Sequence, residues 1–225
     1  MKGQWTVLNL LAELMERSKY KHIIWDWNGT LLDDAWLCLD VINGVLSRRN
    51  MSTISLRQYQ ELFNFPVIDY YVRLGFDFEK ESFEIVGTEF IDNYEKRRHE
   101  VNLQKGAKAV LKSVREAELT QSLLSASLQT TLYEMVEYHR LSDTFLKVMG
   151  LDNHYAHSKV ENGIEWANRI NLSLQEILMI GDTDHDFEVA GAIGVDCLLL
   201  SHGHHCSGRL KKTGAKVVQN LISWR

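Results

Sequence analysis

The chain has 225 residues, a mass of 26.0 kDa and a formal net charge of −5 at pH 7. Hydrophobic residues make up 45% and charged residues 24%, which is typical of a globular chain and excludes a disordered or low-complexity one. The acidic balance argues against a nucleic-acid binder, and no apolar run reaches the roughly 18–20 residues of a membrane-spanning helix. Three scattered cysteines, Cys38, Cys197 and Cys206, do not suit a disulfide framework and favour a cytoplasmic protein with reduced thiols.

The N-terminal segment has the pattern of an amphipathic helix. Leu8, Leu11 and Leu14 recur at helical spacing, and Glu13 interrupts what would be the apolar stretch of a signal peptide. We expect residues 1–20 to form a helix that packs on the core.

A helical block follows the first predicted strand. Residues 22–25 are an apolar run that ends at Asp26 and predicts a buried strand. No convincing strand follows until after residue 103, and helical patterns occur instead at 35–49, 55–63, 67–74 and 79–98. We therefore predict an inserted helical cap over residues 35–103, with a core formed by residues 21–34 and 104–225.

After the insertion, apolar runs alternate with helical patterns. The runs that predict buried strands are 121–124, 145–149, 177–180 and 195–200. The helical patterns between the later runs are 129–140, 160–170 and 184–193. This alternation favours a parallel sheet with helices on both faces. The predicted fold class is α/β, with a three-layer Rossmann-like core, a parallel sheet and an inserted all-helical cap.

Polar residues follow several of the predicted strands, at the edge where open parallel sheets bind their ligands. Asp26–Thr30 follows the first strand, Ser125–Ser127 the second and Gly181–Asp186 the fourth, while Lys159 begins the helix before the fourth strand. This set suits phosphoryl transfer. A carboxylate can attack phosphorus, oxygen ligands bind Mg²⁺, and a lysine with a hydroxyl offsets the charge of the transferring group.

In order and spacing, these segments resemble the four motifs of the haloacid dehalogenase-like hydrolase superfamily. The motif D-x-D-G-T is similar to Asp26–Thr30, the strand-end Ser or Thr to Ser125, the lysine to Lys159, and G-D-x-x-x-D to Gly181–Asp186. The resemblance covers about residues 21–218. The helical insertion between the first two motifs is similar to that of the phosphoglycolate phosphatase-like branch.

The resemblance implies a role for each residue, with Asp26 as the nucleophile. The implied catalytic residues are Asp26, Asn28 and Lys159. The implied phosphate-binding residues are Thr30, Ser125, Ala126 and Lys159, with Thr30 shaping the loop. The implied Mg²⁺ residues are Asp26, Asn28 through its carbonyl, Asp182 and Asp186. The implied activity is a Mg²⁺-dependent phosphatase that hydrolyses a small phosphate monoester, a phosphorylated metabolite, through an aspartyl-phosphate.

Two residues depart from the family pattern. Val160 stands where many members have a proline after the lysine, and the larger departure is Asn28. Phosphatases of the family usually carry a second Asp where this chain has Asn28, and that Asp protonates the leaving oxygen and later activates water. General acid–base help of this kind is typically worth about 10²–10⁴-fold in rate, and an amide does not supply it. Two alternatives therefore stay open, a catalytically weak phospho-ligand sensor or regulatory protein and a phosphotransferase. We expect Asn28→Asp to raise turnover on esters with poor leaving groups, unless His185 or Asp33 already takes the role.

Two further segments are candidates for substrate contact. His202–Cys206 contains four potential transition-metal ligands, but neighbouring side chains rarely bind one ion, which favours a loop that borders the active site. In the insertion, the loop 64–66 and the nearby residues Tyr70, Tyr71 and Arg73 are candidates for choosing the substrate. The substrate itself and the oligomeric state stay open at this level.

Overall fold

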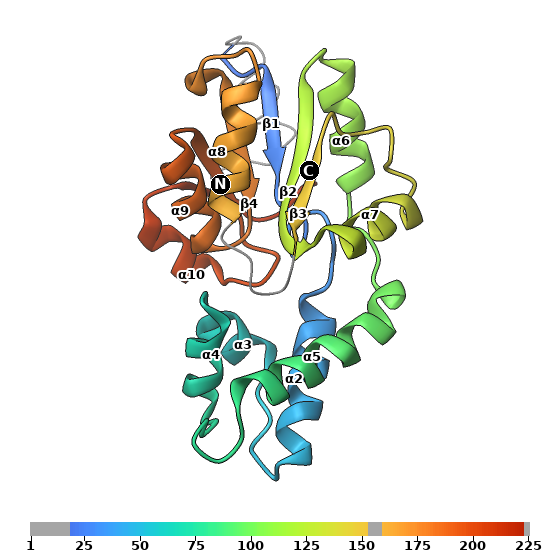
Figure 1. Cartoon of the computed structure of the whole chain (residues 1–225). Helices are drawn as coiled ribbons and strands as arrows, with labels where there is room; N and C mark the ends of the chain where they lie inside the picture. The colour runs from blue at the N-terminus through green and yellow to red at the C-terminus, as the bar shows by residue number, and fades with distance from the viewer. Residues whose placement is uncertain (1–18, 153–158, 223–225) are drawn as a thin grey trace.

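The computed structural model describes residues 19–152 and 159–222, so most of the predicted N-terminal helix lies outside the described residues. The described residues form an α/β core and, on one side of it, a group of helices (Figure 1). None of the described helices is both long and apolar enough to cross a bilayer.

The core is built on a six-stranded sheet in which every neighbouring pair of strands is parallel. The strands are β1 (His22–Trp25), β2 (Thr120–Leu128), β3 (Val148–Leu151), β4 (Ile177–Gly181), β5 (Asp196–Leu200) and β6 (Lys216–Val218). Their spatial order is β3-β2-β1-β4-β5-β6. The chain order changes direction between β1 and β4, and such switch points are where open sheets bind ligands.

Helices cover both faces of this sheet. α6 (Ala107–Glu116) and α7 (Gln129–Tyr138) lie on one face, and α8 (Lys159–Arg169) and α9 (Asp184–Ile193) lie on the other (Figure 1). Successive side chains of a strand point to opposite faces, so Ile23 packs in the cluster with α6 and α7 while Ile24 packs in the cluster with α8 and α9. The predicted fold class is confirmed.

The boundaries of several core elements differ from the prediction. The third strand begins at Val148 rather than at residue 145, because Phe145 packs on the core from the loop before the strand and mimics a strand residue. β2 continues to Leu128, with a shift of register after Leu124. The sequence did not predict β6, because only Val218 of its three residues is buried and the strand has no apolar run.

Four helices fill the stretch between β1 and α6. They are α2 (Ala35–Arg48), α3 (Leu56–Leu62), α4 (Val67–Leu74) and α5 (Phe83–Arg97). We call them the helical insertion. They share a hydrophobic cluster of their own, in which Tyr59, Tyr70 and Tyr71 are buried. The chain returns to the core beside the place where it left, since Leu32 and Leu103 form an antiparallel bridge.

Candidate active site

Three carboxylates and a lysine meet at the carboxyl edge of β1 and β4. Asp26 follows β1, and its N–H donates to Ile180 O of β4 at 2.9 Å. Carboxylate oxygens of Asp26, Asp182 and Asp186 lie within 4.8 Å of one another. The Lys159 Nζ lies 2.5 Å from Asp26 Oδ1 and 2.5 Å from Asp186 Oδ1. All four side chains are buried. Residues separated by up to 160 positions in the chain, from Asp26 to Asp186, therefore form one buried cluster.

One lysine does not neutralise three buried carboxylates, and the pKa values reflect this. Burial raises the pKa of Asp26 to about 6 and holds that of Asp182 well above its usual range. Burial also opposes ionisation of Asp186, but Lys159 outweighs it and lowers the Asp186 pKa. For Lys159, burial opposes the charge while Asp186 and Asp26 raise its pKa. Three carboxyl groups share this buried space with one lysine, so a bound cation would favour the ionised forms of Asp26 and Asp182.

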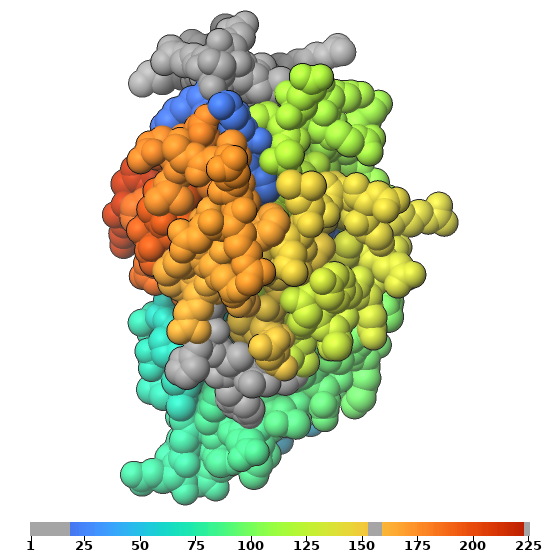
Figure 2. All heavy atoms as spheres, turned by 45° about the horizontal axis from the view of Figure 1, so that its top comes forward, coloured from blue at the N-terminus to red at the C-terminus, as the bar shows by residue number. Residues whose placement is uncertain are grey.

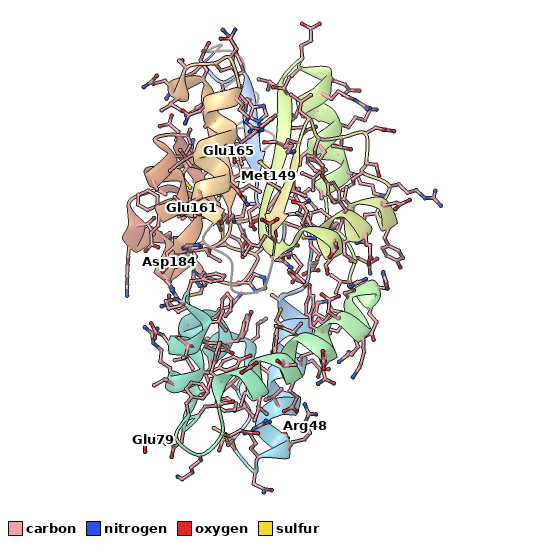
Figure 3. The ribbon with its side chains drawn as sticks, in the orientation of Figure 1. Arg48, Glu79, Met149, Glu161, Glu165 and Asp184 are labelled. Atoms are coloured by element: carbon pink, nitrogen blue, oxygen red, sulfur yellow. The ribbon has the colours of Figure 1, made fainter. Side chains whose placement is uncertain are left out.

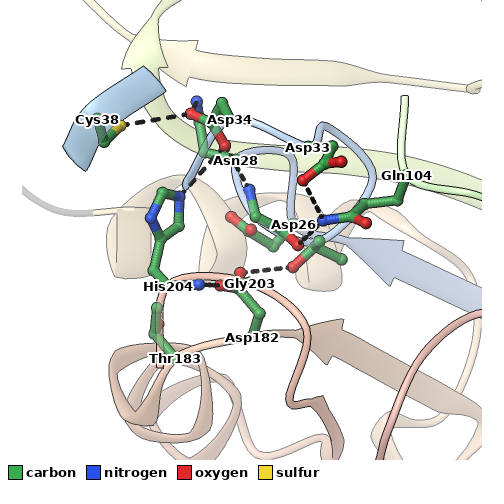
Figure 4. A network of polar contacts seen from close by, with 12 residues as sticks. Asp26, Asn28, Asp33, Asp34, Cys38, Gln104, Asp182, Thr183, Gly203 and His204 are labelled. Carbon is green, nitrogen blue, oxygen red and sulfur yellow. Dashed lines mark hydrogen bonds and ion pairs between the residues drawn. The ribbon is translucent and has the colours of Figure 1, made fainter. Parts of the chain in front are cut away.

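Asp182 is held between two backbone segments that carry glycine. Its Oδ1 accepts from the Thr30 hydroxyl at 2.8 Å, and its Oδ2 accepts from the His204 N–H at 2.6 Å (Figure 4). A Cβ on Gly29 would lie 2.3 Å from Asp182 Oδ2, and one on Gly203 would lie 2.1 Å from it. Both positions therefore need glycine, and Gly29 also has a φ of +73°, which glycine adopts without strain.

Asp186 organises the loop after β4. Its Oδ2 accepts from the N–H groups of Asp182 and Thr183, at 3.1 and 3.0 Å, and from the Thr183 hydroxyl at 2.7 Å. The Thr183 hydroxyl in turn accepts from the Asp186 N–H, which completes a capping box at the start of α9. Asp186 thus connects this loop to Lys159.

Asn28 lies between the phosphate-binding candidates and a second acidic residue. Its Oδ1 accepts from the Ser127 hydroxyl at 2.7 Å and from the Ser125 hydroxyl at 3.4 Å. Its Nδ2 donates to Asp34 Oδ2 at 2.7 Å (Figure 4). Both ends of the amide are therefore engaged within the protein.

Asp34 is the centre of a buried network that joins the core to the insertion. Its carboxylate also accepts from the Gly29 N–H at 2.8 Å and from the Tyr94 hydroxyl at 2.9 Å, and it faces His204 Nε2 at 3.3 Å. Burial works against the His204 charge, but Asp34 overrides it and raises the His204 pKa to about 9. The other ring nitrogen of His204 lies 2.8 Å from the Tyr59 hydroxyl of α3.

The predicted His202–Cys206 loop borders the site and holds the insertion against it. His205 Nε2 lies 3.0 Å from Phe63 O, and its Nδ1 accepts from the Asp184 N–H at 3.1 Å. In Figure 3, Asp184 lies at the edge of the core that faces α3 and α4. The space-filling view shows the segment of α3 and α4, in teal, against the core (Figure 2). The structure thus shows that this loop connects the insertion to the core.

The other predicted site residues lie near the same edge. Ser125 is buried and its Oγ accepts from the Ser127 N–H at 3.0 Å, whereas Ala126 is exposed within the irregular end of β2. The Thr30 side chain faces Asp182. Sequence reasoning missed Asp34 and Tyr94 as partners of this edge, because no local motif marks them, and it placed Ser127 at the edge without giving it a role.

The donor set fits a hard divalent cation. Asp26, Asp182 and Asp186 supply carboxylate oxygens, the ligand type that Mg²⁺ prefers, and they share the site with a single lysine, Lys159. The acidic cluster therefore suits a divalent metal.

Comparisons with known proteins agree with this geometry. The model of the haloacid dehalogenase-like hydrolase family matches residues 23–200. A haloacid dehalogenase-like family hydrolase from Streptococcus pneumoniae has a TM-score of 0.76 at 15% identity, over 90% of this chain and 94% of that one. A predicted phosphatase from Clostridium acetobutylicum has a TM-score of 0.76 at 18% identity, over 90% and 95% of the chains. A predicted phosphoglycolate phosphatase from Haemophilus somnus has a TM-score of 0.72 at 15% identity, over 90% and 95%.

No curated protein matches the chain in sequence. The fold and the buried acidic edge define a Rossmann-like α/β protein with a helical insertion after its first strand. The match to the family model covers most of the chain, and the chain belongs to the haloacid dehalogenase-like hydrolase family.

Proposed function

We propose that this protein is a Mg²⁺-dependent phosphatase that hydrolyses a small phosphorylated metabolite through an aspartyl-phosphate on Asp26. The single observation that carries the proposal is the buried cluster of Asp26, Asp182, Asp186 and Lys159 at the switch point of the sheet. Family membership and the fold it shares with phosphatases support the same conclusion.

The proposed mechanism begins with the Asp26 carboxylate, which attacks phosphorus and displaces the leaving oxygen. Lys159, already bound to Asp26, would hold a phosphate oxygen together with the Ser125 hydroxyl and the Ala126 N–H. Asp26, Asp182, Asp186 and the Asn28 carbonyl would hold Mg²⁺, which supplies charge neutralisation for the phosphoryl group.

The insertion would exclude water and select the substrate, since it packs against the same edge of the core. We also propose a cytoplasmic location, which suits the unpaired Cys38, Cys197 and Cys206.

The direct test is phosphate release from phenyl phosphate with and without Mg²⁺. We expect release to require Mg²⁺ and to fall by roughly 10⁴-fold or more in Asp26→Asn, because the nucleophile is lost. Asp196→Asn is the matched control, since that acid pairs with Lys19 at the start of β5 and should keep the activity. Equal inertness of wild type and Asp26→Asn across a panel of phosphate esters would favour the phospho-ligand sensor instead.

Metal binding has a readout that does not depend on turnover. We expect Mg²⁺ to raise the thermal unfolding midpoint of the wild type, because a ligand that binds the folded state stabilises it. Asp182→Asn should reduce that rise. A midpoint that Mg²⁺ leaves unchanged in the wild type would contradict the proposed metal site.

A further inference from the structure

The surroundings of Asn28 suit an amide and not a carboxylate. Asn28 Nδ2 is a donor 2.7 Å from Asp34 Oδ2, and Asp34 is fully buried. An ionised Asp at position 28 would place a second carboxylate oxygen at that distance with no proton between the two. Two like charges so close, away from water, repel strongly. Asn28, which departs from the family pattern, therefore has a complementary hydrogen-bond partner in Asp34.

The partner is itself firmly fixed. The Asp34 carboxylate accepts from Asn28, from the Gly29 N–H and from the Tyr94 hydroxyl, and it faces the His204 ring. These contacts come from the first motif, from α5 and from the loop after β5. Asp34 thus acts as a positioning residue, which orients the amide so that its Oδ1 points to Ser125 and Ser127.

The proton donors around Asn28 are all directed at acceptors within the protein. The Ser127 and Ser125 hydroxyls donate to Asn28 Oδ1, and the Tyr94 hydroxyl donates to Asp34. The two ring nitrogens of His204 face Asp34 and the Tyr59 hydroxyl. Among the described neighbours of Asn28, the Ser127 and Tyr94 hydroxyls and the His204 ring are held in this network. The Ser125 contact is longer, at 3.4 Å, and would give way to the phosphate.

We propose that Asp34 fixes position 28 as an amide, and that the site therefore takes phosphorylated molecules whose leaving group departs as an anion, such as aryl, enol and acyl phosphates, in preference to alkyl phosphates. The proposal rests on the proposed phosphatase function and names its substrate class. When Asp26 attacks, the P–O bond to the leaving group breaks and that oxygen keeps the electron pair without needing a proton. Water then attacks phosphorus, the electron pair of the P–O bond returns to Asp26 as its carboxylate, and both protons of the water leave with the phosphate as dihydrogen phosphate, which exchanges them with solvent.

The substrate class is tested with phenyl phosphate and benzyl phosphate, with acetyl phosphate as a third probe. The first two molecules are similar in size, but phenol is a far stronger acid than benzyl alcohol. We expect the wild-type kcat/KM to be at least about 10²-fold higher for phenyl phosphate, since the missing proton transfer is worth roughly that much or more. Acetyl phosphate should be cleaved at least as well as phenyl phosphate.

The role of Asp34 is tested by exchanging the two residues. Asn28→Asp alone should lower the thermal unfolding midpoint by roughly 5–10 °C, because it buries two facing carboxylates. Asn28→Asp with Asp34→Asn restores one carboxylate and one amide and should recover most of that loss. It should also raise kcat/KM for benzyl phosphate by roughly 10²-fold, an effect that a structural role alone would not produce. Asn28→Asp with Asp33→Asn is the matched control and should recover less, because Asp33 contacts Gln104 rather than Asn28.

The outcomes separate the inference from the function on which it rests. Phosphate release at similar rates from phenyl and benzyl phosphate would overturn the substrate class while leaving the phosphatase in place. An Asn28→Asp protein as stable as the wild type would overturn the role of Asp34. Release from none of the three probes, with Mg²⁺ present, would overturn the proposed function and the substrate class together.

Discussion

His22 is a buried imidazole at the start of the central strand. One ring nitrogen lies 2.7 Å from the Thr120 hydroxyl and the other 2.9 Å from the Ser122 hydroxyl, both on β2. Burial lowers the His22 pKa to about 4, so the folded state keeps the ring neutral over most of the acidic range. The unfolded chain, with an ordinary pKa near 6.5, takes up a proton earlier.

Stability should therefore depend on pH through this residue. The contribution of the neutral ring is fully present above pH 6.5 and is lost as pH falls from about 6.5 towards 4, by up to about 1.4 kcal/mol per pH unit. We expect urea unfolding of His22→Gln to show a smaller loss of stability over this window than the wild type. His99→Gln, at an exposed position, is the control for the loss of an imidazole. Parallel curves for His22→Gln and the wild type would contradict the assignment.

Two glycines in neighbouring helices, Gly163 and Gly191, differ in what surrounds them. A Cβ at Gly163 of α8 would lie 2.4 Å from Ile193 Cδ1 of α9 and 3.0 Å from Leu124 Cδ2 of β2. A Cβ at Gly191 of α9 would meet nothing within 4 Å. The close approach of α8 to α9 and to the sheet therefore depends on glycine at the first position and not at the second.

The same substitution should have opposite effects at the two sites. We expect Gly163→Ala to lower the free energy of unfolding by about 1–2 kcal/mol, because overpacking outweighs the gain in helix propensity. Gly191→Ala should leave it unchanged or raise it by up to about 1 kcal/mol, because propensity acts alone there. Urea denaturation measures both. An equal effect of the two changes would show that packing between α8 and α9 does not decide their stability.

The side chain of Arg209 joins the core to the helical insertion. Arg209 lies in α10 (Ser207–Leu210), and its Nε donates to Asp184 Oδ2 at 2.7 Å within the core. Its other nitrogens donate to Asn64 Oδ1 at 2.6 Å and to Phe63 O, both in the loop between α3 and α4. One side chain thus holds the loop that the sequence marked as a candidate for substrate choice.

Removing that side chain should free the loop. We expect Arg209→Ala to speed amide hydrogen exchange in a peptide that covers residues 60–66, because the loop loses two hydrogen bonds to the core. Arg57→Ala is the control, since Arg57 is exposed and its ion pair is with Glu61 of the same helix. Exchange in Arg209→Ala that matches the wild type would mean that other contacts are enough to hold the insertion closed.

Much of this molecule follows from local sequence. Apolar runs predicted β1, β4 and β5 within a residue or two, since buried parallel strands need continuous apolar stretches. Ligands bind at the carboxyl edge of open parallel sheets, where the strand ends meet whatever the connections between them. This rule was enough to predict that Asp26, Lys159 and Asp182 lie close together. Short or irregular elements such as β6 were missed because three residues carry too little periodicity.

The surroundings of Asn28 were decided by the tertiary structure. The sequence showed an amide where the family usually has a carboxylate, and it left open what that amide does. The answer depends on Asp34, which directly precedes α2, and on Tyr94 of α5 and His204 of the loop after β5, which lie far along the chain. Hydrogen bonds between such distant side chains leave no periodic or local signal. The sequence by itself therefore determined the fold and the acidic edge, whereas packing of the insertion on the core determined the partners of Asn28.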